Sequence, residues 1–313
     1  MTILVTGGAG FIGSHLVEAC LARGKQVRVL DNLSTGCRQN LVGQRVEFVE
    51  GDVADFSVVA KAVAGCELVF HQAAMVSVPR SVAQPDLNHA TNVTGAFNVF
   101  EAARRAGVKR VVFAFSAAVY GDQPGVPQRE DDLLDPMTPY GVAKLMNEQY
   151  ATTYRRTFGM ELIGLRYMNV FGPRQDPSSP YSGVLSLFCR AAMAGNICTI
   201  YGVERKTRDF VCVSDVVQAN LLAADTLLHD GEVTPVFNIG RGEKTDLLTI
   251  VKMLSELQGR PLSVTHSPER PGDIRHSVAD ISRAQARLGY QPTVSLREGL
   301  RKTLNWFGRR QSQ

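Results

Sequence analysis

The sequence has no Cys-x-x-Cys pair and no histidine–cysteine spacing typical of a metal site, so we expect no bound metal. It also has no apolar run of the roughly 18 residues that a membrane helix needs. The first expected strand begins at residue 2, which leaves no room for a signal peptide. Several of its six cysteines fall in apolar patterns, which is typical of buried thiols in a reducing compartment. We therefore expect a cytoplasmic protein with no membrane partner.

Charge of one sign is also scarce. The net charge is +4 over 313 residues, and the basic residues are scattered rather than gathered in a run that follows a nucleic-acid backbone. We expect no nucleic-acid partner, whereas small anionic substrates remain compatible. With 44% hydrophobic and 20% charged residues, the composition is that of an ordinary globular protein with one large domain or two modest ones.

Glycines are present where a nucleotide site needs them. The apolar run Thr2–Thr6 predicts a buried parallel strand, and apolar residues at helical spacing after it predict a helix. Gly7, Gly10 and Gly13 lie between the two. Gly7 permits a tight turn, Gly10 lets a diphosphate approach the backbone, and Gly13 lets the helix pack closely. The N-terminus of the helix offers free N–H groups to the phosphates.

Acidic residues follow the next two expected strands. Asp31 ends the strand Gln26–Leu30, where an acid accepts both ribose hydroxyls of an adenosine and repels a 2′-phosphate, which favours NAD over NADP. Asp52 follows the strand Val46–Glu50 and is placed to bond an adenine amino group. The small residues Ala73 and Ala74 follow a fourth strand, where a ribose or diphosphate would pass.

Strands and helices alternate through the first half, which predicts a doubly wound parallel sheet with its cofactor crevice at the carboxyl ends of the strands. The further expected strands are residues 111–115, 161–167, 196–201, 208–213 and 236–239. The expected helices are residues 11–23, 55–64, 84–106, 139–158, 184–194, 215–228, 246–257, 281–288 and 296–307. We predict an NAD-binding domain over 1–172, to which the chain returns around 208–240, and a mainly nucleotide-sugar-binding domain over 173–313.

A candidate catalytic group follows the fifth strand. Ser116 ends that strand, and Tyr140 and Lys144 share one face of the helix that begins at Pro139. A lysine ammonium near a phenol is expected to lower the phenol pKa from its usual value of about 10. The phenolate would then serve as general base toward a sugar hydroxyl, with Ser116 sharing a hydrogen bond to that hydroxyl. We favour a structural role for His71.

The motifs together resemble those of the extended short-chain dehydrogenases/reductases, in the branch that acts on nucleotide sugars. The resemblance covers essentially the whole chain and is strongest to the UDP-glucose/UDP-N-acetylglucosamine 4-epimerases. It rests on the motifs at residues 6–13, 31–32, 116–120, 140–144, 166–173, 207–210 and 270–273.

The resemblance implies NAD, a UDP-sugar substrate and a set of site residues. The implied catalytic residues are Ser116, Tyr140 and Lys144. The implied NAD ligands are Gly7, Gly10, Phe11, Ile12, Gly13, Asp31, Asn32, Asp52, Val53, Ala73, Ala74, Asn92, Tyr140, Lys144 and Tyr167. The implied substrate ligands are Ser77, Ser116, Asn169, Val184, Tyr201, Arg208, Arg270, Asp273 and Ser277, with the two arginines holding the diphosphate.

The resemblance further implies epimerisation at C4 through a transient 4-keto sugar, with NAD regenerated at each turnover. Small Ser277 at the family's gate position is expected to admit N-acetylated sugars as well as glucose and galactose. Ala117 and Ala118 replace the acids of related dehydratases, which argues against dehydration. The alternatives are a UDP-uronate epimerase, a 4-keto sugar reductase and, from another class, a non-catalytic NAD-sensing regulator. A homodimer formed by the helices at 84–106 and 139–158 is also implied.

Overall fold

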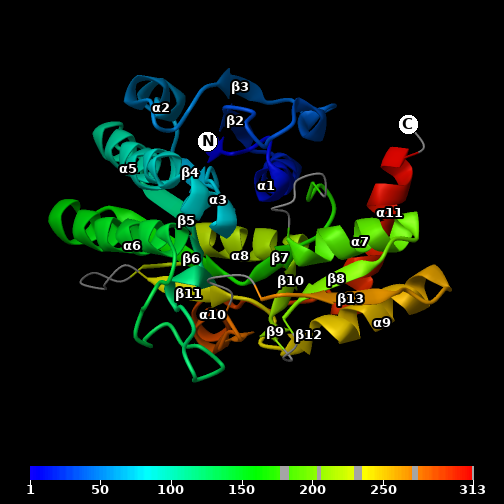
Figure 1. Ribbon diagram of the computed structural model, residues 1–313. Helices are drawn as coiled ribbons and strands as arrows, with labels where there is room; N and C mark the ends of the chain where they lie inside the picture. The colour runs from blue at the N-terminus through cyan, green and yellow to red at the C-terminus, as the bar shows by residue number, and fades with distance from the viewer. Residues whose placement is uncertain (177–182, 203–205, 229–234, 270–273, 312–313) are drawn as a thin grey trace.

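The computed structural model describes residues 1–176, 183–202, 206–228, 235–269 and 274–311, with only the backbone described for residues 310 and 311. Within these ranges, a central sheet lies between two layers of helices, and a smaller group of helices and short strands packs beside it (Figure 1).

The central sheet has seven strands within the described residues, in the order β11-β6-β5-β4-β1-β2-β3, and every neighbouring pair is parallel. Its strands are β1 (Thr2–Thr6), β2 (Gln26–Asp31), β3 (Glu47–Glu50), β4 (Leu68–His71), β5 (Arg110–Ser116), β6 (Glu161–Tyr167) and β11 (Val236–Ile239). The predicted doubly wound parallel sheet is confirmed. The strand order reverses between β1 and β4, and such a switch point is where open α/β sheets bind ligands.

Helices cover both faces of the sheet, so its central strands are apolar on both sides. In β1, Ile3 and Val5 pack with α1 (Phe11–Ala22) and α8 (Val213–Asp225), whereas Leu4 packs with α2 (Phe56–Val63), α5 (Gly95–Arg105) and α6 (Pro139–Phe158). Figure 1 shows α5 and α6 side by side on one side of the sheet and α1 and α8 on the other. This explains the continuous apolar run of the first strand.

A third apolar core lies in the C-terminal half of the chain. It is built around Phe188, Ile200, Phe210 and Leu254. Its elements are α7 (Val184–Ala194), β8 (Cys198–Tyr201), β10 (Phe210–Cys212), α9 (Leu247–Gln258), β13 (Val264–Ser267) and α11 (Leu296–Gln311). Short pairings tie it to the main sheet: β7 (Asn169–Phe171) follows β6 and pairs in parallel with β10.

The remaining elements are short. They are η1 (Arg38–Leu41), α3 (Val78–Ala83), α4 (Pro85–Asn88), η2 (His89–Thr94), η3 (Ala117–Val119), β9 (Thr207–Arg208), β12 (Thr245–Asp246), β14 (His276–Ser277) and α10 (Ser282–Leu288). β9 lies between β12 and β14 in a three-stranded sheet.

Several predicted elements differ from the structure in their bounds. The single helix expected over residues 84–106 is divided, because α4 passes into the π-helical turn η2 before α5 begins. The extra residue of a π turn shifts the faces of the two halves, a feature often found at functional sites. The strand expected over residues 208–213 is divided at Asp209 into β9 and β10, and α8 begins at Val213 rather than at Asp215.

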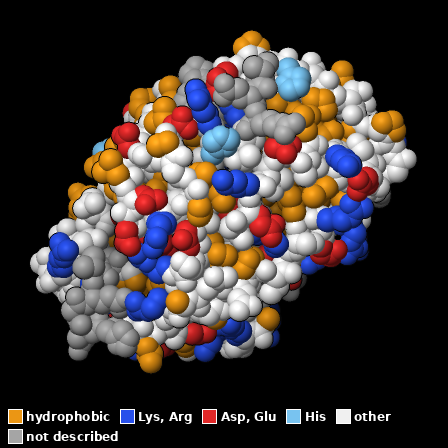
Figure 2. All heavy atoms as spheres, turned by 90° about the horizontal axis from the view of Figure 1, so that it is seen from below, with side chains coloured by type: hydrophobic (Ala, Val, Ile, Leu, Met, Phe, Trp, Pro, Cys, Tyr) orange, Lys and Arg blue, Asp and Glu red, His pale blue; other side chains and the backbone are white. Residues whose placement is uncertain are grey.

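The face seen from below mixes charges of both signs, with Lys and Arg side chains interspersed among Asp and Glu (Figure 2). No helix in the described ranges combines the length and the apolar character needed to cross a membrane. The same ranges contain no group of three or more His, Cys, Asp and Glu side chains placed to hold a metal ion.

Candidate active site

The turn between β1 and α1 has the geometry of a phosphate-binding loop. Gly7 has a φ of +67°, in the left-handed region that favours glycine, and a Cβ on Gly13 would lie 2.1 Å from the Gly7 carbonyl oxygen. Gly10, the N-cap of α1, has no side chain to cap the free N–H groups, and the first turn has no acidic residue. The turn therefore fits an anionic diphosphate. Phe11 and Ile12 are the first two residues of α1, and their side chains pack against the C-terminal core.

Asp31 lies beside the glycine turn, where the sequence placed it. Its Oδ2 accepts a hydrogen bond from the Ala9 N–H at 2.9 Å, and its Oδ1 accepts one from the Leu33 N–H at 2.8 Å. Burial raises the Asp31 pKa, while these two hydrogen bonds act to lower it. Asn32 donates from Nδ2 to Asp52 Oδ2 at 2.8 Å, so the two predicted adenosine ligands are joined.

The predicted ligands after β3 and β4 lie at the same edge of the sheet, and backbone groups of some of them form hydrogen bonds within the protein. Val53 is buried beneath α5, with its carbonyl oxygen bonded to Asn98. The Ala73 N–H donates to Thr6 Oγ1 at 3.2 Å, and Ala74 follows it. Asn92, in the π turn, accepts from the Met75 N–H and donates to the Met75 carbonyl, both at 2.9 Å. Asn92 therefore holds the loop after β4 in place.

The three predicted catalytic residues meet at the end of β5. The Ser116 side chain lies close enough to the Tyr140 phenol to act on its pKa. Lys144 lies one helical turn after Tyr140, with Nζ 5.8 Å from the centroid of the phenol ring and 2.9 Å from the Ala114 carbonyl oxygen, to which it donates. Both Tyr140 and Lys144 are buried. This arrangement places a hydroxyl, a phenol and an ammonium around one point at the carboxyl edge of the sheet.

The expected lowering of the Tyr140 pKa by Lys144 is corrected by the structure. Burial raises the Tyr140 pKa, although the nearby Ser116 side chain acts in the opposite direction. Burial also lowers the pKa of Lys144 to about 8, since desolvation disfavours the ammonium. In the protein alone, desolvation outweighs the attraction between the phenolate and the ammonium. Positive charge added beside the buried phenol would lower its pKa.

Two small residues hold the start of α6 against η3 and α3. A Cβ on Gly141 would lie 2.7 Å from the Ala118 carbonyl oxygen, so the glycine lets the first turn of the helix approach. Ser81 is fully buried, and its Oγ accepts a hydrogen bond from the Tyr140 N–H at 3.2 Å. Sequence reasoning did not identify Ser81 as a site residue.

The predicted substrate ligands fall into one connected group and several separate places. Arg208 and Ser277 are paired residues of β9 and β14, and the Asn169 N–H donates to the Asp209 carbonyl at 3.0 Å. Val184 begins α7 and Tyr201 ends β8. Ser77 caps α3 by accepting from the Arg80 N–H at 3.1 Å. The predicted ligands Arg270 and Asp273 lie outside the described residues.

Tyr167 pairs with Ser116 across β5 and β6, and its phenol points toward Asn220 of α8. Its hydroxyl accepts from Asn220 Nδ2 at 2.7 Å and donates to Gln72 Oε1 at 3.2 Å. Any contact of Tyr167 with a cofactor would therefore use its backbone. His71 is buried and shares a hydrogen bond of 2.7 Å with Thr6, and burial lowers its pKa to about 3, in keeping with a structural role.

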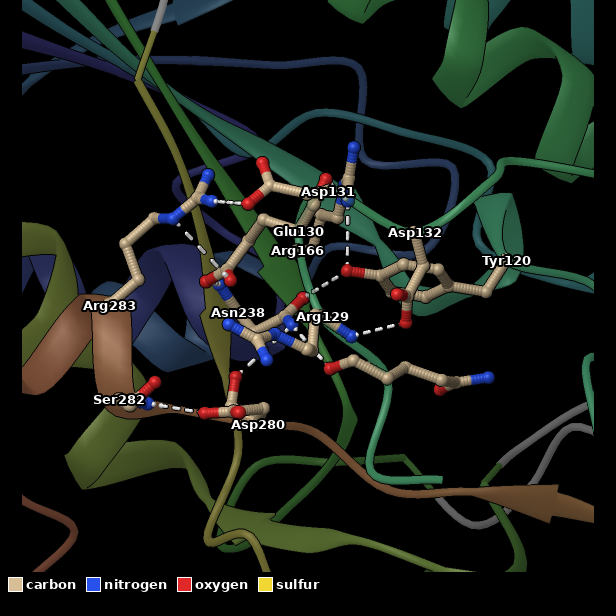
Figure 3. Close-up of polar contacts among 11 residues, drawn as sticks. Tyr120, Arg129, Glu130, Asp131, Asp132, Arg166, Asn238, Asp280, Ser282 and Arg283 are labelled. Carbon is tan, nitrogen blue, oxygen red and sulfur yellow. Dashed lines mark hydrogen bonds and ion pairs between the residues drawn. The ribbon is translucent and has the colours of Figure 1, made fainter. Parts of the chain in front are cut away.

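A buried polar cluster contacts α6, the helix that carries Tyr140 and Lys144. Arg166 of β6 forms a bidentate ion pair with Glu148 of α6, with distances of 2.8 and 2.6 Å. Arg166 Nη1 also donates to the Tyr120 hydroxyl at 2.8 Å, which in turn donates to Asn238 Oδ1 at 2.7 Å. Figure 3 shows the Tyr120 hydroxyl between Arg166 and Asn238. The Arg166 cluster, defined by Tyr120, Glu148, Arg166 and Asn238, thus joins α6, β6 and β11.

Comparison with known proteins places these features in a family. Residues 3–240 match the model of the NAD dependent epimerase/dehydratase family. A UDP-glucose 4-epimerase from Thermotoga maritima, solved with UDP-glucose, is 38% identical with a TM-score of 0.94, and the match covers 100% of both chains.

Two further solved structures are similar over almost the whole chain. A UDP-N-acetylglucosamine 4-epimerase from Methanobrevibacter ruminantium, in complex with UDP-N-acetylmuramic acid, is 35% identical with a TM-score of 0.93, covering 99% of this chain and 98% of the other. A Thermus thermophilus UDP-glucose 4-epimerase in complex with NAD is 38% identical with a TM-score of 0.89, covering 98% and 99%. The predicted resemblance is confirmed: this chain belongs to the NAD dependent epimerase/dehydratase family.

Proposed function

We propose that this protein inverts C4 of a UDP-hexose with NAD as a retained cofactor, and that it accepts UDP-N-acetylglucosamine and its C4 epimer as well as UDP-glucose and UDP-galactose. The observation that carries this proposal is that Ser116 lies next to the Tyr140 phenol, with Lys144 one turn away, at the sheet edge that also carries the glycine turn and Asp31. Similar chains that are named UDP-sugar 4-epimerases support it.

The residues of the site have distinct roles in the proposed reaction. Bound NAD supplies the acceptor and the donor of the C4 hydride, so no net oxidation occurs. Tyr140 takes the proton of the C4 hydroxyl, and Ser116 holds that hydroxyl by a shared hydrogen bond. Lys144 brings positive charge to the phenol, which needs it because burial raises the Tyr140 pKa. The resulting 4-keto sugar rotates within the site. Tyr140 returns the proton to the C4 oxygen once hydride has returned to the other face of C4.

The test of this proposal is proton NMR of UDP-N-acetylglucosamine incubated with the purified protein and no added NAD. Appearance of the C4 epimer would support the reaction, the retained cofactor and the N-acetylated substrate together. If only UDP-glucose reacts, the proposed acceptance of the acetamido group is wrong. If neither sugar reacts although NAD is bound, a uronate substrate or a sensor without turnover becomes the better hypothesis, and a need for added NADH would indicate a reductase.

Replacing Ser277 by Tyr should separate the two classes of sugar. Ser277 is 2% exposed and faces Arg208 across the β9–β14 pair, so a phenol there would fill space that a 2-acetamido group needs. We expect kcat/KM for UDP-N-acetylglucosamine to fall about tenfold more than that for UDP-glucose, in line with the selectivity of steric pockets. Both sugars are assayed on the same variant preparation, so loss of stability affects them equally. Equal losses would contradict the gate role of Ser277.

We also propose a homodimer formed through α5 and α6. Both helices expose large apolar side chains, including Phe97 at 37%, Val142 at 44% and Phe158 at 48%. Such residues on neighbouring helices suit a helical interface in which each partner buries the other's apolar face. Analytical ultracentrifugation at micromolar concentration should give twice the chain mass of 34.1 kDa. A monomer at that concentration would contradict this proposal.

A further inference from the structure

Asp209 connects residues that are predicted to bind the substrate. It lies between β9 and β10, directly after Arg208, and its side chain is completely buried. Its backbone N–H donates to the Ser277 carbonyl oxygen at 2.8 Å, and its own carbonyl accepts from the Asn169 N–H at 3.0 Å. One residue therefore links β7, β9 and β14 at the points where the sequence placed substrate ligands.

The carboxylate of Asp209 holds two further segments. Its Oδ1 accepts from the Arg241 N–H at 2.8 Å, and its Oδ2 accepts from the N–H groups of Gly242 at 2.9 Å and Ala279 at 3.3 Å. An ionised carboxylate suits this place, because it only accepts hydrogen bonds. A Cβ on Gly240 would lie 2.4 Å from Oδ2, so the glycine makes room for the carboxylate.

The position of β14 against β9 determines where Arg208 and Ser277 lie. These two residues are paired in the parallel register of the strands. The Arg208 guanidinium donates to the carbonyl oxygens of Ile274 at 2.6 Å and Arg275 at 3.1 Å, in the segment that leads into β14. A change in the distance between the two strands would therefore move the arginine predicted to hold the diphosphate and the serine predicted to face the sugar.

We infer that Asp209 is a positioning residue for the UDP-sugar, which it orients through Asn169, Arg208 and Ser277 without touching the substrate itself. The inference rests on the proposed function, since those three residues are assigned to the substrate there. Hydrogen bonds to an ionised carboxylate are about twice as strong as neutral ones, so three of them resist displacement of β14 and of the loop after β11. Small displacements of binding groups have large effects on affinity and rate.

The same geometry gives the site a dependence on pH. Burial raises the Asp209 pKa to about 6, while the three N–H donors act to lower it. The charged and titratable groups around it are Arg241 and Glu243 on the loop after β11, Tyr290, and His276 on β14. Above pH 6 the carboxylate is ionised and accepts all three hydrogen bonds. As the pH falls through about 6, protonation places an O–H among N–H donors, so the KM for the UDP-sugar should rise.

The test compares Asp209→Asn with a matched control, Asp215→Asn. Asp215 is 1% exposed, and its carboxylate also accepts backbone hydrogen bonds, from Thr293 at 3.0 Å and Val294 at 3.2 Å, but it joins none of the predicted substrate residues. For Asp209→Asn we expect KM to rise about tenfold, the usual scale for a lost hydrogen bond to a charged group. The kcat and the NAD bound per chain should change little. The Asp215→Asn control should have a lower Tm and an unchanged KM.

Two further measurements do not depend on the folding of Asp209→Asn. Gly240→Ala pushes on the carboxylate without changing any charge, and it should also raise KM. In the wild type, KM should rise as the pH falls from about 7 to about 5. Where Asp209→Asn folds, this rise should be absent from it. That comparison distinguishes Asp209 from His276 as the cause of the pH dependence of KM.

The inference would be overturned by an unchanged KM in Asp209→Asn, by an equal rise in Asp215→Asn, or, if Asp209→Asn does not fold, by an unchanged KM in Gly240→Ala. If the wild type epimerises no UDP-sugar, the proposed function fails, and calorimetry with UDP alone decides this inference separately. Weaker UDP binding in Asp209→Asn than in Asp215→Asn would then support it, and equal binding would overturn it.

Discussion

Tyr140→Phe should lower kcat for UDP-sugar epimerisation by about 10²- to 10⁴-fold, the range that a positioned general acid–base group contributes. The substitution removes the hydroxyl that lies beside Ser116 and keeps the ring that is buried at the start of α6. Binding of UDP should change little, because the phenol acts at C4 and not on the nucleotide. The measurement is single-turnover and steady-state epimerisation, with bound NAD quantified in each preparation.

The matched control is Tyr154→Phe. Tyr154 lies on the same helix, is also buried, and donates from its hydroxyl to Glu101 of α5 at 3.1 Å. We expect its kcat to stay within about twofold of wild type, since no reacting group depends on it. A Tyr140→Phe variant with near-normal kcat would show that another group moves the proton. His71 is a poor candidate for that role, because it is buried and bonded to Thr6.

Arg166→Met should cost about 3–5 kcal/mol of the free energy of unfolding, the range for breaking one partner of a buried ion pair. The side chains of Arg166 and Glu148 are only 4% and 7% exposed. Removal of Arg166 leaves the Glu148 carboxylate buried without its bidentate partner, and it also removes a donor to the Tyr120 hydroxyl. Urea denaturation followed by circular dichroism measures the loss.

Two comparisons test whether the buried charge causes that loss. Arg23→Met breaks an exposed ion pair with Asp225, whose side chains are 44% and 69% exposed, and should cost about 0–1 kcal/mol. The double variant Arg166→Met with Glu148→Leu should be less destabilised than the sum of the two single variants, because it leaves no unpaired charge. An Arg166→Met variant as stable as Arg23→Met would contradict the importance of the buried pair.

Much of the fold was predictable because it depends on local patterns. β1, α6, β6 and α7 have the bounds expected from apolar periodicity and from Pro139 at the start of α6. The glycine turn was predictable because Gly10 and Gly13 both approach Gly7 within one short motif. The division into two domains and the roles of the site residues remain predictions.

The elements that were missed depend on contacts between distant parts of the chain. The π turn at His89–Thr94 forms where Asn92 bonds to Met75 and where the Asn147 side chain donates to the Asn92 carbonyl. The strand expected over 208–213 is divided at Asp209 because the backbone pairing changes there: its N–H donates to Ser277 of β14 and its carbonyl accepts from Asn169 of β7. Neither set of partners has a signal in the local sequence.

The sequence by itself determined the parallel sheet, the glycine turn, Asp31 and the identities of Ser116, Tyr140 and Lys144, since periodicity and short motifs encode them. Only the tertiary structure decided how these groups behave. Burial reverses the expected direction of the Tyr140 pKa shift. One hydrogen bond joins Ser81 to Tyr140 across 59 positions of the chain, and another joins Asp209 to Ala279 across 70. Desolvation and long-range hydrogen bonding are properties of the packed molecule, so a one-dimensional pattern cannot specify them.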